Sequence, residues 1–201
     1  MTKKILFDLG SNNGCSIRKF SKIFSDFKDI QVYAFEPGSV SNSKEMLETL
    51  ETFSNVTLFR NPVSDTERDI TFYEHTQNSS ACTTWESKAK DKNRRGDCGS
   101  DIKGEVVQKN IKSISISTFI RGVIKDNPDA ELIIKCDIEG EEYRVIPSLL
   151  KENIFLNVTH LYMEWHDEWN TTSVSSSELT NLISKQNCNI IIDKTWNALG
   201  W

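Results

Sequence analysis

The strongest structural signal in the chain is the stretch Phe7-Asp8-Leu9-Gly10-Ser11-Asn12-Asn13-Gly14. It joins an apolar run that predicts a strand, residues 5–9, to residues 17–27, whose apolar side chains recur at helical spacings of three and four. A glycine turn between a strand and a helix is typical of doubly wound α/β sheets, where ligands bind at the carboxyl ends of the strands. The glycines follow G-x-x-x-G and not the G-x-G-x-x-G of a dinucleotide-binding turn. We therefore expect a ligand site at this turn.

The same alternation of strand and helix continues along the chain. Apolar runs predict further strands at 31–35, 56–59, 131–137, 160–165 and 189–193, and helical spacing predicts helices around 46–53, 143–150 and 179–183. Strands that alternate with helices favour a mostly parallel, doubly wound sheet with helices on its faces. We expect one α/β domain over residues 1–201, with no internal repeat.

One long segment, about 76–105, breaks the alternation. Its thirty or so residues carry almost no apolar periodicity, and structureless segments beyond ~12–15 residues are often lids, binding loops or disordered. Two interpretations stay open, a solvated excursion and a lid over the substrate. The flanks 70–73 and 114–116 both alternate apolar and polar residues, so we expect them to pair as a small antiparallel addition.

Composition excludes several classes of protein. The 201 residues carry 24 Lys and Arg against 29 Asp and Glu, a net charge of −5, which disfavours binding to nucleic acid or to an anionic membrane surface. No apolar run reaches the ~18 residues that would span a bilayer, and the start of the chain does not resemble a signal peptide. Five cysteines without a C-x-x-C pair favour a reducing compartment. We expect a cytoplasmic protein.

Two acidic residues point to the ligand. Asp8 lies two residues before Gly10, where it would repel a pyrophosphate but could receive a cation such as an ammonium group. Glu36 ends the second strand, where a carboxylate can accept hydrogen bonds from both hydroxyls of a ribose. The sulfonium cofactor S-adenosylmethionine meets both demands. After the third strand, residues 61–65 could form the wall of an adenine pocket.

At this point the chain resembles a known family. The segments FDLGSNNG, FEPGS, RNPVSDTERDITFYEH, IIKCDIEGEEYRVIPSLL and LYMEWH are similar to those of FkbM-type S-adenosylmethionine-dependent methyltransferases. The most specific segment is Asp137-Ile-Glu-Gly-Glu-Glu-Tyr143, which matches the family block D-x-E-G-x-E-Y. The resemblance implies a Rossmann-like class I methyltransferase fold and O-methylation of hydroxyls on sugars, glycans or polyketide-type metabolites. The cofactor-binding residues expected from the turns and the resemblance are Asp8, Gly10, Ser11, Asn12, Gly14, Glu36, Pro37, Asn61, Val63, Ser64 and Asp137.

The expected catalytic residues follow two neighbouring strands. Asp137 and Glu139 come after the fourth strand, and Glu164 and His166 come at the end of the fifth, so the four should meet at one edge of a parallel sheet. Methyl transfer to a sugar hydroxyl needs that hydroxyl aligned and its proton removed. His166 suits a general base because imidazole titrates near neutrality, and Glu139 could fill the same role. A divalent cation, Mg²⁺ or Mn²⁺, held by the carboxylates is the other possibility.

The acceptor and the assembly are expectations from the resemblance. A sugar hydroxyl is expected, with a deoxyhexose such as rhamnose or fucose in a glycan as the first candidate. The alternatives are a polyketide or other small metabolite, a protein, and a cofactor-fold module without catalysis. Little sequence follows residue 193, so we expect a reduced C-terminal strand hairpin. The chain also begins at its first strand, which suggests one domain of a larger polypeptide or a homo-oligomer that shares walls.

Overall fold

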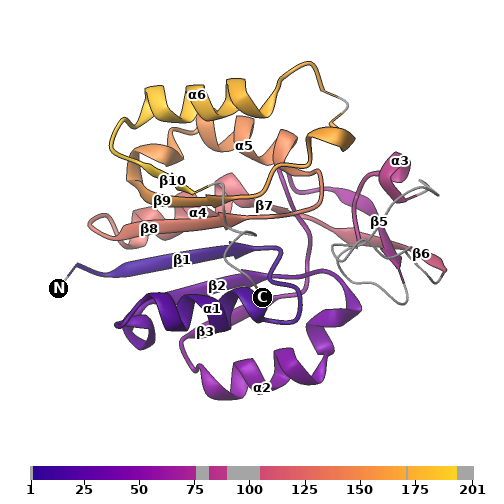
Figure 1. Ribbon diagram of the computed structural model, residues 1–201, viewed down its shortest axis with the longest axis horizontal. Helices are drawn as coiled ribbons and strands as arrows, with labels where there is room; N and C mark the ends of the chain where they lie inside the picture. Colours follow the sequence, from indigo (N-terminus) through magenta and orange to yellow (C-terminus); the bar gives the residue numbers. More distant parts are fainter. Residues whose placement is uncertain (1, 76–81, 90–104, 171, 194–201) are drawn as a thin grey trace.

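A six-stranded sheet forms the centre of the molecule (Figure 1). The computed structural model describes residues 2–75, 82–89, 105–170 and 172–193. The strand order is β10-β9-β8-β1-β2-β3, and every neighbouring pair is parallel. The strands are β1 (Lys4–Leu9), β2 (Gln31–Phe35), β3 (Val56–Phe59), β8 (Glu131–Cys136), β9 (Val158–Met163) and β10 (Ile191–Asp193). The order runs outward in both directions from β1, so the sheet is doubly wound and the expected Rossmann-like fold is confirmed.

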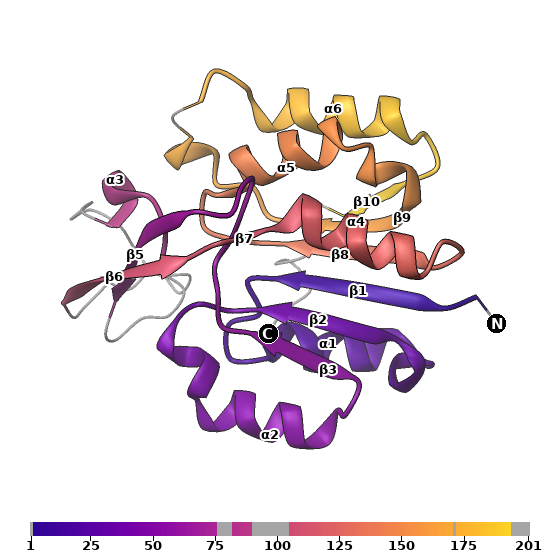
Figure 2. The same ribbon diagram turned by 180° about the vertical axis from the view of Figure 1, so that it is seen from behind.

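Helices cover both faces of the sheet. One face carries α1 (Cys15–Ile23) and α2 (Lys44–Thr52), and the other carries α4 (Ile116–Asp126), α5 (Glu142–Lys151) and α6 (Ser176–Gln186). Figure 2 shows the sheet from the side of α4. Short 3-10 turns complete the connections: η1 (Phe27–Asp29), η2 (Ser39–Asn42), η4 (Ile154–Asn157) and η5 (Asp167–Trp169).

The alternation of side chains along β1 builds the two cores. Ile5 and Phe7 face the layer of α4, α5 and α6, whereas Leu6 packs with Ile17 and Phe20 of α1. All five side chains are fully buried, and each such burial contributes about 1.5–3 kcal/mol. Because side chains alternate along a strand, Asp8 points to the same face as Leu6, toward α1.

Helix α4 is absent from the sequence-based expectations, which ended a strand at residue 116. The structure begins a helix there, with Ile116 and Ile120 buried on its inner face. The β-branched residues Ile114 and Ile116 favour a strand locally. However, Ile116 and Ile120 are four residues apart, so in a helix both lie on the same side and pack into the core. The fifth predicted strand, 160–165, lies two residues earlier in the structure. Strand β9 runs over Val158–Met163, so Glu164 and His166 follow it directly.

The expected pairing of residues 70–73 with 114–116 is wrong. Strand β5 (Asp69–His75) pairs antiparallel with β6 (Val106–Lys112), and β7 (Ile114–Ser115) pairs parallel with β4 (Val63–Ser64). Strand β6 is mostly exposed and polar, so apolar alternation did not reveal it. The β5–β6 pair and the short helix α3 (Glu86–Ala89) project beyond the carboxyl end of β1 (Figures 1 and 2).

Parts of two expectations lie outside the described residues. These are residues 76–81 and 90–104 of the expected lid, and the expected C-terminal hairpin after Asp193. Within the described ranges, no helix combines the length and the apolar character needed to cross a membrane.

Candidate active site

A cavity of about 770 Å³ opens at the carboxyl ends of β1, β2 and β8. Its walls come from the glycine turn, from the ends of β2 and β3, from residues 82–84 beside α3, and from the loops after β8 and β9. The sequence-predicted residues that line it are Gly10, Asn12, Glu36, Pro37, Asn61, Val63, Asp137, Glu139 and Glu164. The predicted residues that do not line it are Asp8, Ser11, Gly14, Ser64 and His166.

The glycine turn fits tightly between β2 and β8. The backbone N–H groups of Gly10 and Ser11 both donate to the carbonyl oxygen of Phe35, at 3.0 and 3.1 Å. Gly10 has a φ of +81°, and a Cβ at this position would collide with the carbonyl oxygen of Asp137. Only glycine meets both constraints, so this residue brings the turn against the end of β8.

Glu36 stands at the end of β2 with 8% of its surface exposed. Its Oε1 accepts from the N–H of Gly38 at 2.8 Å, and its Oε2 accepts from the N–H of Asn12 at 2.9 Å. Burial raises the pKa of Glu36 to about 7, against the opposing effect of these two bonds. A carboxylate offers about four lone-pair sites, so the fixed group retains capacity for further donors in the cavity.

Asp8 lies beneath the cavity floor and has no exposed surface. Its Oδ2 accepts from Ser16 Oγ at 2.5 Å, and its Oδ1 lies 3.7 Å from Lys135 Nζ. Burial raises the pKa of Asp8, although Lys135 opposes this. The carboxylate that we expected to receive a cation from the ligand therefore faces a cation of the protein itself.

Sequence reasoning missed Lys135, which stands on the central strand β8 and is 1% exposed. Its Nζ donates to the carbonyl oxygen of Gly10 at 2.5 Å and lies 3.2 Å from Asp137 Oδ2. Burial alone would lower the pKa of Lys135, but Asp137 and Asp8 outweigh it and raise the pKa. Conversely, Lys135 and then His166 overcome burial and hold the pKa of Asp137 below its usual value. The available signal was a lysine inside an otherwise apolar run, since a lysine is rarely buried unless paired.

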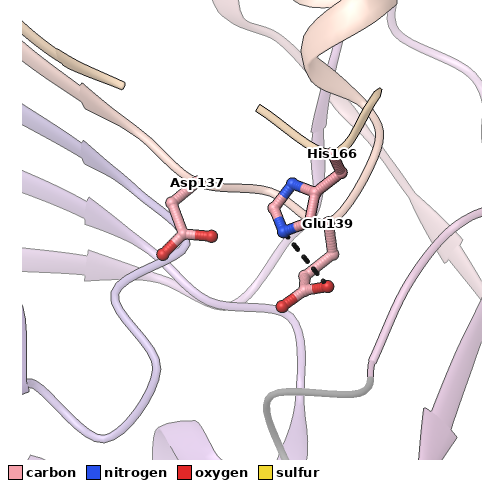
Figure 3. Close-up of side chains that lie close together, drawn as sticks. All are labelled: Asp137, Glu139 and His166. Atoms are coloured by element: carbon pink, nitrogen blue, oxygen red, sulfur yellow. Dashed lines mark ion pairs between the residues drawn. The ribbon is translucent and has the colours of Figure 1, made fainter. Parts of the chain in front are cut away.

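The expected catalytic residues meet at the ends of β8 and β9. Ligand-capable atoms of Asp137, Glu139 and His166 all lie within 4.8 Å of one another, and Figure 3 shows the three side chains gathered together. His166 Nε2 lies 3.6 Å from Glu139 Oε2 and 3.9 Å from Glu164 Oε1. One imidazole nitrogen therefore faces two carboxylates that line the cavity.

The other imidazole nitrogen is held by Glu142, which belongs to the Asp137–Tyr143 block but had no role assigned from the sequence. His166 Nδ1 lies 2.6 Å from Glu142 Oε1, and Glu142 has no exposed surface. The same carboxylate accepts from the N–H groups of Gly140 at 2.7 Å and Ile138 at 3.2 Å. Glu142 thus fixes both the loop after β8 and the orientation of His166.

Glu141 lies in the loop after β8 and is 1% exposed. It links this loop to Ser64 of β4 and to Thr84. Its Oε1 accepts from Ser64 Oγ at 2.5 Å, and its Oε2 accepts from Thr84 Oγ1 at 2.6 Å. Thr83 Oγ1 donates to the carbonyl oxygen of Glu139 at 2.7 Å. The segment 82–85 is therefore attached to the loop that carries the carboxylates, and neither threonine was expected from the sequence.

The comparison with protein families agrees with this geometry. The family described as Methyltransferase FkbM domain matches residues 8–190. The chain belongs to the FkbM methyltransferase family. All residues that line the cavity lie within the match to the FkbM domain, including Gly10 and, from the Asp137–Tyr143 block, Asp137, Ile138, Glu139 and Glu141. Searches of curated proteins and of solved structures gave no match.

Proposed function

We propose that this FkbM methyltransferase transfers a methyl group from S-adenosylmethionine to a hydroxyl of a sugar, with a deoxyhexose such as rhamnose or fucose in a glycan as the first candidate. The observation that carries the proposal is one cavity lined both by Glu36 and by the carboxylates beside His166. Glu36 follows β2, whereas Asp137 and Glu164 follow β8 and β9 on the far side of β1. This separation supports one region of the cavity for the proposed nucleoside and another for the proposed acceptor hydroxyl.

The residues present fit the cofactor. Glu36 is fixed by two backbone donors and can accept from ribose hydroxyls, while Asn61 and Val63 would flank the adenine. The turn at Gly10 permits close approach of the backbone to the amino-acid end. When bound, S-adenosylmethionine supplies an electrophilic methyl group on its sulfonium.

The residues around His166 supply a way to remove the proton of the acceptor hydroxyl. Glu142 accepts the hydrogen on Nδ1, which leaves the lone pair on Nε2 toward Glu139 and Glu164. In the proposed role, His166 Nε2 takes the proton of the hydroxyl, and Glu142 stabilises the imidazolium that forms. Glu139 and Glu164 orient the acceptor through its hydroxyl groups.

A divalent cation is the second candidate for activating the hydroxyl. The specific observation is the convergence of Asp137, Glu139 and His166 within 4.8 Å. Two carboxylates and an imidazole would suit Mn²⁺, and Mg²⁺ less well because it prefers oxygen ligands. Such an ion would acidify the hydroxyl, and His166 would then be a ligand and not the base.

The test is incubation of the purified chain with S-adenosylmethionine labelled on the methyl group and a panel of rhamnose- and fucose-bearing oligosaccharides. The matched control is Glu36→Ala, which should lose transfer at low cofactor concentration. Label on a deoxyhexose oxygen supports the proposal. Label on a polyketide or other small-metabolite hydroxyl supports the alternative acceptor, whereas label on protein alone contradicts both.

Two further proposals concern the cellular setting. A sugar or glycan is the proposed partner, and a homo-oligomer or a larger polypeptide would provide additional walls for it. We also propose a reducing compartment such as the cytoplasm, because the four cysteines in the described ranges are free thiols.

A further inference from the structure

A charge triad lies at the floor of the cavity and is not used by the proposed proton transfer. Asp8 on β1 and Lys135 on β8 are partners in the register of the two parallel strands, and Asp137 follows two residues later. Lys135 Nζ lies 3.7 Å from Asp8 Oδ1 and 3.2 Å from Asp137 Oδ2. Asp8 and Lys135 are 0% and 1% exposed, so water screens their charges poorly.

The triad has an excess of one negative charge, because two carboxylates surround one ammonium. Of the three side chains, Lys135 and Asp137 line the cavity and Asp8 does not. Asp8 is therefore poorly placed to contact a ligand, but its charge still acts across the short distance to the floor. Ser16 Oγ donates to Asp8 and supports its ionised form.

The order of the strands places this excess charge near the sulfonium. If Glu36 after β2 holds the ribose, the sulfonium attached to that ribose lies toward β1 and β8, since the reacting cluster follows β8 and β9. The triad occupies the ends of these same two strands, β1 and β8. A cationic sulfonium would meet a net negative floor there, whereas the neutral thioether left after transfer would not.

We propose that Asp8 and Lys135 together set the charge of this floor. The two carboxylates favour the cationic cofactor over its neutral product, S-adenosylhomocysteine, and Lys135, a positioning residue, limits that preference by its opposite charge. Lys135 neutralises one carboxylate and leaves one uncompensated. The inference rests on the proposed function only in taking S-adenosylmethionine as the cofactor. It assigns product discrimination to two residues, Asp8 and Lys135, that do not take part in the chemical step.

The experiment is a double-mutant cycle read by calorimetric titration, which needs no acceptor. The dissociation constants of S-adenosylmethionine and S-adenosylhomocysteine are measured for the wild type, Asp8→Asn, Lys135→Met and the double variant. Asp8→Asn removes a negative charge and Lys135→Met a positive one, so the double variant restores the net charge of the wild type. Lys112→Met is the control, because it breaks an ion pair with Glu67 outside the cavity.

The measured quantity is the ratio of the two dissociation constants, product over cofactor. A unit charge about two strand spacings, ~10 Å, from the sulfonium, at an effective dielectric of about 20, changes this ratio by roughly tenfold or somewhat more. We expect a fall of that size in Asp8→Asn, a rise in Lys135→Met, and a return to near the wild-type ratio in the double variant. A merely structural role would weaken both ligands together and leave the ratio unchanged.

Loss of folding in one variant does not remove the test. Lys135 also donates to the carbonyl oxygen of Gly10, so Lys135→Met alone could disrupt the turn. Asp8→Asn keeps the shape of the side chain and decides the question by itself: a ratio equal to that of the wild type overturns the inference. A wild type that binds neither ligand contradicts the proposed function instead.

Discussion

His166 Nδ1 lies 2.6 Å from Oε1 of Glu142, a carboxylate with no exposed surface. Glu142 is the first residue of α5, and His166 follows β9, so packing of this helix on the sheet aligns the pair. A buried carboxylate on one ring nitrogen fixes the tautomer and directs the other nitrogen, which here faces Glu139 and Glu164. The pair can support either a general base or a metal ligand.

If His166 is the general base, His166→Ala should lower kcat by ~10²–10⁴ and leave cofactor affinity nearly intact, because the base acts only in the chemical step. Steady-state kinetics with a responsive glycan and calorimetry with S-adenosylmethionine measure the two effects. The control is His160→Ala, since His160 stands on β9 beside Tyr162 and does not line the cavity. Wild-type turnover in His166→Ala would rule out the base.

If a divalent cation activates the hydroxyl, excess EDTA should abolish transfer, and Mn²⁺ should restore it. Elemental analysis and titration with Mn²⁺ should also show one bound ion in the wild type and a weakened site in Asp137→Asn or Glu139→Gln. The physical reason is the convergence of three ligand atoms within 4.8 Å. Full activity in excess chelator, with no ion bound, would eliminate this alternative.

Glu36→Ala should raise the dissociation constant of S-adenosylmethionine tenfold or more without unfolding the domain. In the proposed role of Glu36, the substitution would remove two charge-assisted hydrogen bonds to the ribose, each worth ~1.5–3 kcal/mol. Calorimetric titration measures the affinity, with exposed Glu45→Ala on α2 as the control. Unchanged affinity in Glu36→Ala would refute the assignment to the ribose.

The raised pKa of Glu36 predicts two opposite pH dependences. In the folded chain this pKa is about 7, above the ordinary 4.5, so the folded chain binds the proton more tightly between these values. The contribution of Glu36 to the free energy of unfolding therefore falls as pH rises from about 4.5 to 7 and remains low above it. Cofactor affinity should rise from about pH 6 to about pH 8, because the carboxylate is the better acceptor.

Thermal melting without ligand and calorimetry with ligand check these two slopes. The matched variant is Glu36→Gln, which has no proton to exchange. The melting temperature of Glu36→Gln, measured relative to that of the wild type, should increase as pH rises. Its affinity for S-adenosylmethionine should be weaker than that of the wild type and should vary little with pH. Parallel pH profiles for the two proteins would contradict the prediction.

Glu141→Ala should destabilise the fold by about 3 kcal/mol or more, because it removes a buried carboxylate that accepts from Thr84 and Ser64 and pairs with Arg68. For a chain of this size that is a fall in melting temperature of about 6–12 °C. The control Arg121→Ala breaks an exposed pair with Glu152 and should cost less than about 1 kcal/mol. Equal losses of stability in the two variants would show that the buried contacts of Glu141 contribute no more than an exposed ion pair.

The alternation of strands and helices could be predicted from the sequence, because periodic burial is a local property of each segment. It placed Glu36, Asp137 and Glu139 just after strands, and parallel strands bring such residues to one edge. The convergence of Glu164 and His166 with them followed from the same rule. Helix α4 was missed where the β-branched residues Ile114 and Ile116 favoured a strand locally.

The tertiary structure alone decided which partners these residues have. The sequence assigned both Asp8 and Glu36 to the ligand, but Asp8 faces Lys135 and does not line the cavity, while Glu36 does. Strand β5 pairs with β6, which begins about thirty residues later in the sequence. These outcomes depend on register and packing between distant segments, and local periodicity carries no information about which of several polar groups will satisfy a buried charge.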